Sequence, residues 1–293
     1  MSEKPTNIVS IYKRFPTADD CLSHIETVRW KGRPMCPYCT SDRATKAKTD
    51  WRYHCNACNT SFSVTVNTIF HHTHLDLQKW FLAIALILNA KKGISARQLA
   101  RDIEVNRNTA WYLGMRIRRA MLDVGERELL TGIVEMDETY IGGKPRKGGP
   151  PLKRGRGTKK QPVVGMIERG GKVRAQMAKR DSGLSAKSLS KLVRQNVDIA
   201  TATIYTDEHA GYLRLSDFVN HGVINHKVWY VDGDCHTNSI ESFWALLKRG
   251  IVGQYHKVSL RHLPQYINEF CYRFNNRKRA DVFDLTICKA LGV

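Results

Sequence analysis

Long hydrophobic runs are missing from this sequence of 293 residues. The longest apolar stretch, WFLAIALIL at 80–88, is too short to span a bilayer, and Lys79 and Lys91 flank it. The opening residues, MSEKPTNIVS, lack the apolar core of a secretion signal. These absences argue against a membrane or secreted protein. We therefore expect a cytoplasmic protein whose cysteines stay reduced.

Acidic residues are also scarce. The chain has 27 Asp and Glu against 47 Lys and Arg, which gives a net charge of +20 and a pI near 9.8. So large an excess predicts an anionic partner, and without a membrane segment the expected partner is nucleic acid. An apolar content of 42% is enough for a core, and the length suggests about two domains with a small added module.

Two close cysteine pairs stand out among the eight cysteines. Cys36 and Cys39 precede Cys55 and Cys58 in a C-x2-C-x15-C-x2-C pattern. Zinc takes four thiolates in a tetrahedron, and two such pairs supply them. With short strands expected around the second pair, residues 1–65 predict a zinc ribbon whose folding depends on structural Zn²⁺. The alternative is that these four are unrelated thiols. Cys21, Cys235, Cys271 and Cys288 have no paired spacing, and we interpret them as structural.

Residues 68–125 carry helical patterns. Ser95 and Gln98 can open one helix, and Asn106 can cap a second after a short turn. This spacing is typical of a helix-turn-helix, although a plain helical bundle would show a similar one. The second helix is expected to direct Arg107, Asn108, Tyr112, Arg116, Arg118 and Arg119 outward, the first four of them toward DNA.

The region 130–293 alternates between strand-like and helix-like segments. A strand is expected at 132–143, a hairpin at 162–180 turning at 169–171, and further strands at 201–207 and 224–233. Helices are expected at 185–197 and 237–250. The expected fold class is therefore α/β, with a mixed sheet covered by helices.

Three carboxylates in this region attract attention through their positions. Asp137 lies inside the first strand, Asp207 ends a strand 70 residues later, and Glu241 follows on a helix after another 34. A single acid of this kind would be a surface residue, but three on a sheet and its covering helix can converge. Their repulsion is relieved by divalent cations such as Mg²⁺, and two such ions can hold the oxygens of a phosphoryl transfer.

The helix that carries Glu241 has a clear apolar stripe. Ile240, Phe243, Trp244 and Leu247 recur at helical spacing and are expected to be buried. Glu241 and Lys248, seven residues apart, then share a neighbouring face, with Asn238 one turn earlier.

A basic segment interrupts the sheet at 144–160. It has many Gly and Pro residues and no acid, so it cannot form a core. It is either a solvated linker or an arm that contacts DNA. The basic residues expected to contact DNA are Lys144, Arg146, Lys147, Lys153, Arg154, Arg156, Lys159 and Lys160.

Four sequence blocks together resemble the DDE transposases of bacterial insertion sequences, in the branch with an N-terminal zinc ribbon. The blocks are CPYC with CNAC, MDETYIGG followed by the basic segment, YTDEHAGY, and HTNSIESFWALLKRG. The resemblance implies an RNase H-like catalytic domain at 130–293 that binds the terminal inverted repeats of an element, cleaves its ends and joins them to target DNA. It also implies a homo-oligomer associated with the nucleoid.

The same resemblance implies particular residue roles. Asp137, Asp207 and Glu241 would hold two Mg²⁺ or Mn²⁺ ions, and Lys248 would lie near the DNA end. Asn238 is the alternative third ligand, and otherwise supports the site together with His236.

Other classes of protein stay open at this stage. A DNA-binding regulator with an inactive core would bind DNA without cutting it. A nuclease for RNA–DNA hybrids would share the fold but would not explain the zinc ribbon and helical region. A zinc hydrolase is excluded because the sequence has no His-rich catalytic zinc site.

Overall fold

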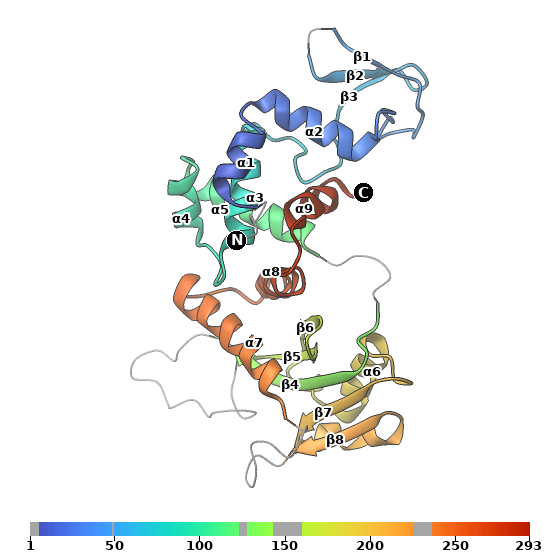
Figure 1. Ribbon diagram of the computed structural model, residues 1–293, viewed down its shortest axis with the longest axis vertical. Helices are drawn as coiled ribbons and strands as arrows, with labels where there is room; N and C mark the ends of the chain where they lie inside the picture. Colours follow the sequence, from blue (N-terminus) through green and yellow to red (C-terminus); the bar gives the residue numbers. More distant parts are fainter. Residues whose placement is uncertain (1–5, 49, 123–127, 143–159, 225–235) are drawn as a thin grey trace. The chain divides into compact units, whose positions relative to one another are not determined.

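The computed structural model describes residues 6–48, 50–122, 128–142, 160–224 and 236–293 (Figure 1). The chain forms two compact units. One comprises Met1–Leu122 with Asn276–Val293, and the other comprises Asp123–Asn275. Within the described residues no helix is both long and apolar enough to cross a membrane.

The first unit begins with two helices and a small sheet. Helix α1 (Ile8–Arg14) is followed by α2 (Ala18–Trp30), which starts at a reciprocal capping box between Thr17 and Asp20. The sheet has three antiparallel strands in sequence order, β1 (Ala44–Lys46), β2 (Arg52–Cys55) and β3 (Thr60–Ser63). Trp30 packs against Tyr53 and Phe62 of this sheet, which supplies the ribbon with a small aromatic core.

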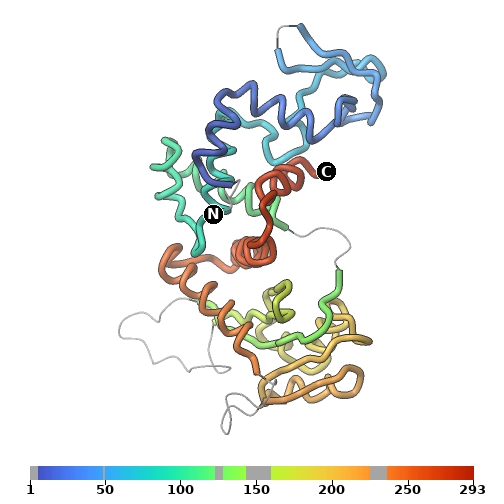
Figure 2. The backbone as a smooth tube through the Cα atoms, in the orientation of Figure 1, coloured from blue at the N-terminus to red at the C-terminus, as the bar shows by residue number. Residues whose placement is uncertain are grey.

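The rest of the first unit is helical. Helix α3 (Leu77–Asn89) is largely buried, and α4 (Ala96–Asp102) and α5 (Arg107–Ala120) pack together after it. Ser95 and Asn106 cap α4 and α5 as the sequence indicates. The last helix of the chain, α9 (Val282–Leu291), packs against α2, α3 and α5, and the tube in Figure 2 follows this return of the chain. The C-terminal residues 276–293, expected in the catalytic domain, therefore cluster with the N-terminal unit.

One outward direction expected on α5 is wrong. Arg118 is only 3% exposed, with its guanidinium 3.7 Å from the sulfur of Met115. Gly114 leaves room for it, because a Cβ there would lie 3.1 Å from the Arg118 guanidinium. Helical periodicity alone does not reveal such a space.

The second unit is built on a five-stranded mixed sheet. Its strands are β4 (Ile133–Ile141), β5 (Gln161–Glu168), β6 (Val173–Met177), β7 (Thr203–Asp207) and β8 (Asn220–Ile224), in the order β6-β5-β4-β7-β8. Strands β4, β5 and β6 are antiparallel, whereas β7 and β8 run parallel to β4. This is the strand order of the RNase H-like fold, which confirms the expected class. Most of the strand expected at 224–233 lies outside the described residues.

Helices cover both faces of this sheet. Helix α6 (Ala186–Asn196) and the 3₁₀ segment η2 (Ala210–Asp217) pack on one face. Helix α7 (Asn238–Arg249), the π-helical turn η3 (Gly250–Gln254) and α8 (Leu263–Asn275) pack on the other. Because side chains alternate along a strand, Val134 and Met136 of β4 face α6, while Glu135 and Asp137 face α7.

Candidate functional site

Asp137 and Asp207 come together on adjacent strands. Strands β4 and β7 are parallel, with Glu135 paired to Tyr205, and the two aspartates lie two residues beyond that pair. Oxygen atoms of Asp137, Glu138 and Asp207 all lie within 4.8 Å of one another. The sheet therefore brings three carboxylates together where β7 ends beside the middle of β4.

The electrostatics of this group favour a cation. Burial, together with the neighbouring charges of Glu138 and Asp207, raises the pKa of Asp137 to about 7. Oxygen donors packed closely enough to repel one another are the ligands that Mg²⁺ and Mn²⁺ take. The donor set thus fits a hard divalent cation.

Trp244 of α7 orients the first of these acids. Its indole Nε1 donates a 3.0 Å hydrogen bond to Asp137 Oδ2. The ring reaches the strand because Gly165, the residue paired with Asp137 on β5, has no side chain. A Cβ on Gly165 would lie 2.5 Å from the Trp244 ring and 3.1 Å from Ile240. Glycine at this position lets α7 approach the sheet closely enough to hold Asp137.

We expect Gly165→Val to displace Trp244 and to destabilise the second unit. Overpacking of a tight core costs about 1–3 kcal/mol, and here the added atoms would meet a rigid ring. Thermal or urea unfolding of the purified variant measures the loss. Gly253→Val is the control, because a Cβ there has no neighbour within 4 Å. Equal stability of the two variants would contradict this close packing.

Glu138 is the member of the group that sequence reasoning did not assign. It follows Asp137 directly, so strand alternation predicts that the two side chains diverge. The buried hydroxyl of Tyr212 donates a 2.8 Å hydrogen bond to Glu138 Oε2. Burial holds the pKa of Tyr212 well above its usual value, with the charge of Glu138 adding to the effect, so the phenol remains a donor. The pair of adjacent acids in MDETY was the only available signal.

Helix α7 places the remaining predicted residues. Its apolar stripe is buried as expected, with Ile240, Phe243, Trp244 and Leu247 all in the core. Glu241 lies in the first turn, where its carboxylate accepts a 3.2 Å hydrogen bond from the Thr237 hydroxyl. It is exposed, as are Asn238 and Lys248. Among the carboxylates of the described residues, the structure groups Glu138 rather than Glu241 with the two aspartates.

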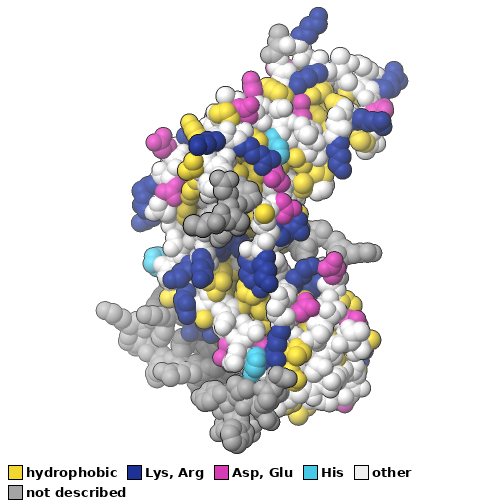
Figure 3. Space-filling model, in the orientation of Figure 1, with side chains coloured by type: hydrophobic (Ala, Val, Ile, Leu, Met, Phe, Trp, Pro, Cys, Tyr) yellow, Lys and Arg dark blue, Asp and Glu magenta, His cyan; other side chains and the backbone are white. Residues whose placement is uncertain are grey.

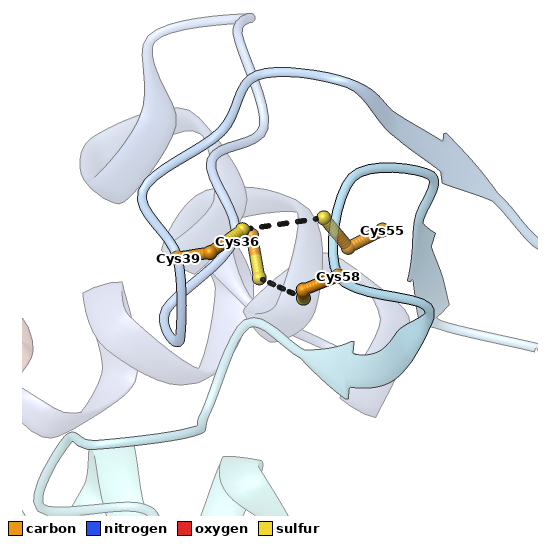
Figure 4. A group of neighbouring side chains, drawn as sticks. All are labelled: Cys36, Cys39, Cys55 and Cys58. Carbon is orange, nitrogen blue, oxygen red and sulfur yellow. Dashed lines mark hydrogen bonds between the residues drawn. The ribbon is translucent and has the colours of Figure 1, made fainter.

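The four paired cysteines converge in the first unit. Figure 4 shows their side chains pointing toward one another from two loops. The Cys36 and Cys58 sulfurs are 3.7 Å apart, those of Cys39 and Cys55 are 3.5 Å apart, and one ligand atom from each lies within 4.8 Å of the others. Backbone N–H groups of Cys58 and Ala57 lower the pKa of Cys55 to about 6, which favours the thiolate that zinc binds. The set fits a tetrahedral zinc ion.

The residues of α5 that were predicted to contact DNA differ in their surroundings. Arg107 and Asn108 open α5 on its exposed side, and the Tyr112 side chain is 67% exposed. Arg116 instead donates to the His71 carbonyl and lies over the Trp80 ring, so it stabilises the unit.

Most of the basic segment 144–160 lies outside the described residues. Of its eight cations, Lys144, Arg146, Lys147, Lys153, Arg154, Arg156 and Lys159 lie outside the described residues. Lys160 is described and lies against Gly142. On the face drawn in Figure 3, Lys and Arg side chains are spread widely over the surface, with acidic side chains among them.

We expect the stabilising effect of Mg²⁺ to depend on pH. The pKa of Asp137 rises from 3.8 to about 7 on folding, so without a cation its contribution to stability falls as pH rises from about 4 to 7. A cation binds the ionised carboxylate of Asp137 and therefore competes with the proton for it. The increase in melting temperature caused by Mg²⁺ should therefore be small one pH unit below 7 and large one unit above. Asp137→Asn should remove this difference, and an equal increase at both pH values in the unmutated protein would contradict it.

Comparison with known proteins places the chain in a family. Residues 129–275 match the model of the ISXO2-like transposase domain, and residues 16–61 match that of the transposase zinc-ribbon domain. A protein in transposable element ISH50 of Halobacterium salinarum is 31% identical over 89% of this chain and 92% of its own length. The chain therefore belongs to the ISXO2-like transposases.

Two solved structures of Mos1 assemblies are also similar, at a low level. The Mos1 strand transfer complex matches with a TM-score of 0.30 and 14% identity, covering 72% of this chain and 75% of that one. A pre-cleavage Mos1 transpososome matches with a TM-score of 0.28 and 14% identity, covering 71% and 77%.

Proposed function

We propose that this protein is the DNA transposase of an insertion sequence. It binds the terminal inverted repeats, cleaves DNA strands at the ends of the element and joins those ends to target DNA. The observation that carries the proposal is the convergence of Asp137 and Asp207, with Glu138, on adjacent strands of a domain from a transposase family.

The residues of the second unit have distinct parts in this reaction. Asp137 and Asp207 provide carboxylate oxygens for two Mg²⁺ or Mn²⁺ ions, and Glu241 provides a third from α7, with Asn238 as the alternative. When bound, the ions supply Lewis-acid activation and neutralise charge on the phosphodiester. Lys248, two turns after Glu241, holds a phosphate of the DNA end. The hydrogen bond from Trp244 keeps one Asp137 oxygen occupied and so directs the other toward the ions.

The first unit and the basic segment bind DNA in this proposal. Arg107, Asn108 and Tyr112 lie on the exposed side of α5 and contact base edges as the second helix of a helix-turn-helix. Arg116 contributes through its support of α5 rather than through bases. The basic residues of 144–160 hold phosphates. Two ends must be cut and joined together, so we also propose that the active form is a homo-oligomer.

Joining of pre-cleaved ends tests this function. The substrate is a short duplex that ends in the flank of the protein's own gene with a free 3′-OH, incubated with a plasmid and Mg²⁺. Covalent insertion of the duplex into the plasmid is the expected result. Tight binding of the duplex without joining under any divalent cation would favour the DNA-binding regulator. Cleavage of RNA–DNA hybrids without joining would favour a hybrid nuclease.

A further inference from the structure

Glu135 is a buried acid that the proposed chemistry does not use. It lies two residues before Asp137 on β4, faces α7, and is 0% exposed. Isolated carboxylates are costly to bury, so a fully buried one must be compensated by charge and hydrogen bonds. The partners of Glu135 therefore show what it does in the fold.

Both oxygens of Glu135 bind the start of α7. Oε2 accepts hydrogen bonds from the backbone N–H groups of Ser239 at 2.7 Å and Ile240 at 3.0 Å. Oε1 accepts one from the Ser239 hydroxyl at 3.0 Å and lies 3.3 Å from His236 Nδ1. The first backbone N–H groups of a helix have no partner inside it and favour an anion. Glu135 supplies that anion from the neighbouring strand, whereas Thr237, the residue before the helix, makes no side-chain cap.

Arg169 compensates the charge and extends the contact. Its Nε donates to Glu135 Oε1 at 2.7 Å, and its Nη2 donates to the His236 carbonyl at 3.0 Å. The guanidinium also lies over the ring of Tyr205, 5.2 Å from its centre. One ion pair, buried on the side of Glu135, thus connects β4, the β5–β6 turn, β7 and the residues that lead into α7.

The consequence is a helix fixed to one strand at two points. Glu135 holds the first turn of α7, and Asp137 is bonded to Trp244 one turn further along. Asn238 directly precedes Ser239, and Glu241 lies between Ile240 and Trp244, so both residues belong to the part of α7 that these contacts hold. Their distance from the aspartates therefore depends on the contact that Glu135 makes.

We propose that Glu135 is a positioning residue for strand cleavage, which fixes the start of α7, and with it Glu241 and Asn238, against the strand that bears Asp137. This inference rests on the proposed function. Glu135 acts through these residues and does not itself contact the DNA or the ions.

Two variants separate positioning from stability alone. Glu135→Gln keeps the length of the side chain and removes its charge, but it leaves the half-buried Arg169 without its carboxylate partner. Glu135→Gln combined with Arg169→Gln removes both charges, so net charge is unchanged and no guanidinium is left unpaired. Glu128→Gln is the control, because Glu128 is a surface acid whose side chain is 83% exposed and paired with Lys172.

Three quantities are measured on the zinc-loaded full chain: melting temperature, Mn²⁺ affinity by calorimetry, and the Mn²⁺ concentration for half-maximal cleavage of labelled end DNA. Changes to residues that orient metal ligands typically cost about 10–100-fold in metal affinity or activity. We expect both Glu135 variants to need at least about tenfold more Mn²⁺. The double variant should melt closer to the unmutated protein than the single variant does, and Glu128→Gln should change none of the three quantities.

The inference is overturned if Glu135→Gln leaves the Mn²⁺ requirement unchanged, or if the double variant recovers both melting temperature and Mn²⁺ requirement. Either result would make Glu135 a structural residue only. If the unmutated protein cleaves no DNA, the proposed function fails instead. The calorimetric Mn²⁺ affinities then still decide whether Glu135 positions the site.

Discussion

We expect Asp207→Asn to abolish strand cleavage and to leave binding to the element's ends intact. The substitution is nearly isosteric, and an Asn Oδ1 can still accept the hydrogen bond that the His209 backbone N–H donates to Asp207 Oδ1. What is lost is one negative ligand next to Asp137. Metal ions contribute several kcal/mol to such reactions, and each ~1.4 kcal/mol is tenfold in rate, so we expect a loss of roughly a thousandfold or more.

The measurement pairs gel-shift binding with cleavage of end-labelled DNA in Mg²⁺. Asp217→Asn is the matched control, because Asp217 is an exposed aspartate of the same unit, outside the carboxylate group. Cleavage by Asp207→Asn at the rate of this control would remove Asp207 from the site. Loss of binding together with cleavage would show that the substitution disturbs more than the ligand.

We expect removal of zinc to unfold the ribbon and to leave the carboxylate site folded. The ribbon has three strands of three or four residues, with a small aromatic core around Trp30. Structural zinc contributes apparent binding free energies of about 10–16 kcal/mol in modules of this size, far more than so small a core. The carboxylate group belongs to the other unit, with its own core on both faces of the sheet.

Cys55→Ser and a chelator should have the same effect. We expect amide hydrogen exchange to accelerate in β1, β2 and β3, bound zinc to be lost, and exchange in β4 and β7 to stay slow. Cys288→Ser is the control, since Cys288 is outside the four-cysteine group. Slow exchange in the ribbon after complete removal of zinc would contradict a metal-dependent fold.

Local patterns predicted much of this structure. The two Cys-x-x-Cys pairs predict the convergence of four sulfurs. The reason is that a structural zinc ion takes four ligands in a tetrahedron, and these ligands come at characteristic spacings in the sequence. The stripe from Ile240 to Leu247 predicts the buried face of α7, and strand patterns predict β4 and β7 with Asp137 and Asp207. The RNase H-like class followed from the resemblance and is confirmed by the strand order.

What the sequence did not predict depends on contacts between distant segments. Gly165 looks like an ordinary strand glycine, and its importance lies in Trp244, 79 residues later. Arg118 has the spacing of a surface residue, yet it is buried beside Gly114. Glu135 occupies a position of β4 that strand alternation directs into the core, but glutamate is a residue type that usually lies on the surface. Its partners, the backbone N–H groups of Ser239 and Ile240, lie 104 and 105 residues later in the sequence.

The central claim is that Asp137 and Asp207 hold the divalent cations with which this protein cuts DNA. The most direct test of it is strand cleavage by the unmutated protein. The substrate is end-labelled linear DNA that carries both flanks of its own gene, incubated with and without Mg²⁺. Breaks at one defined position in each flank, only when Mg²⁺ is present, are the predicted result. Firm binding to the flanks with no break under Mg²⁺ or Mn²⁺ would contradict the claim.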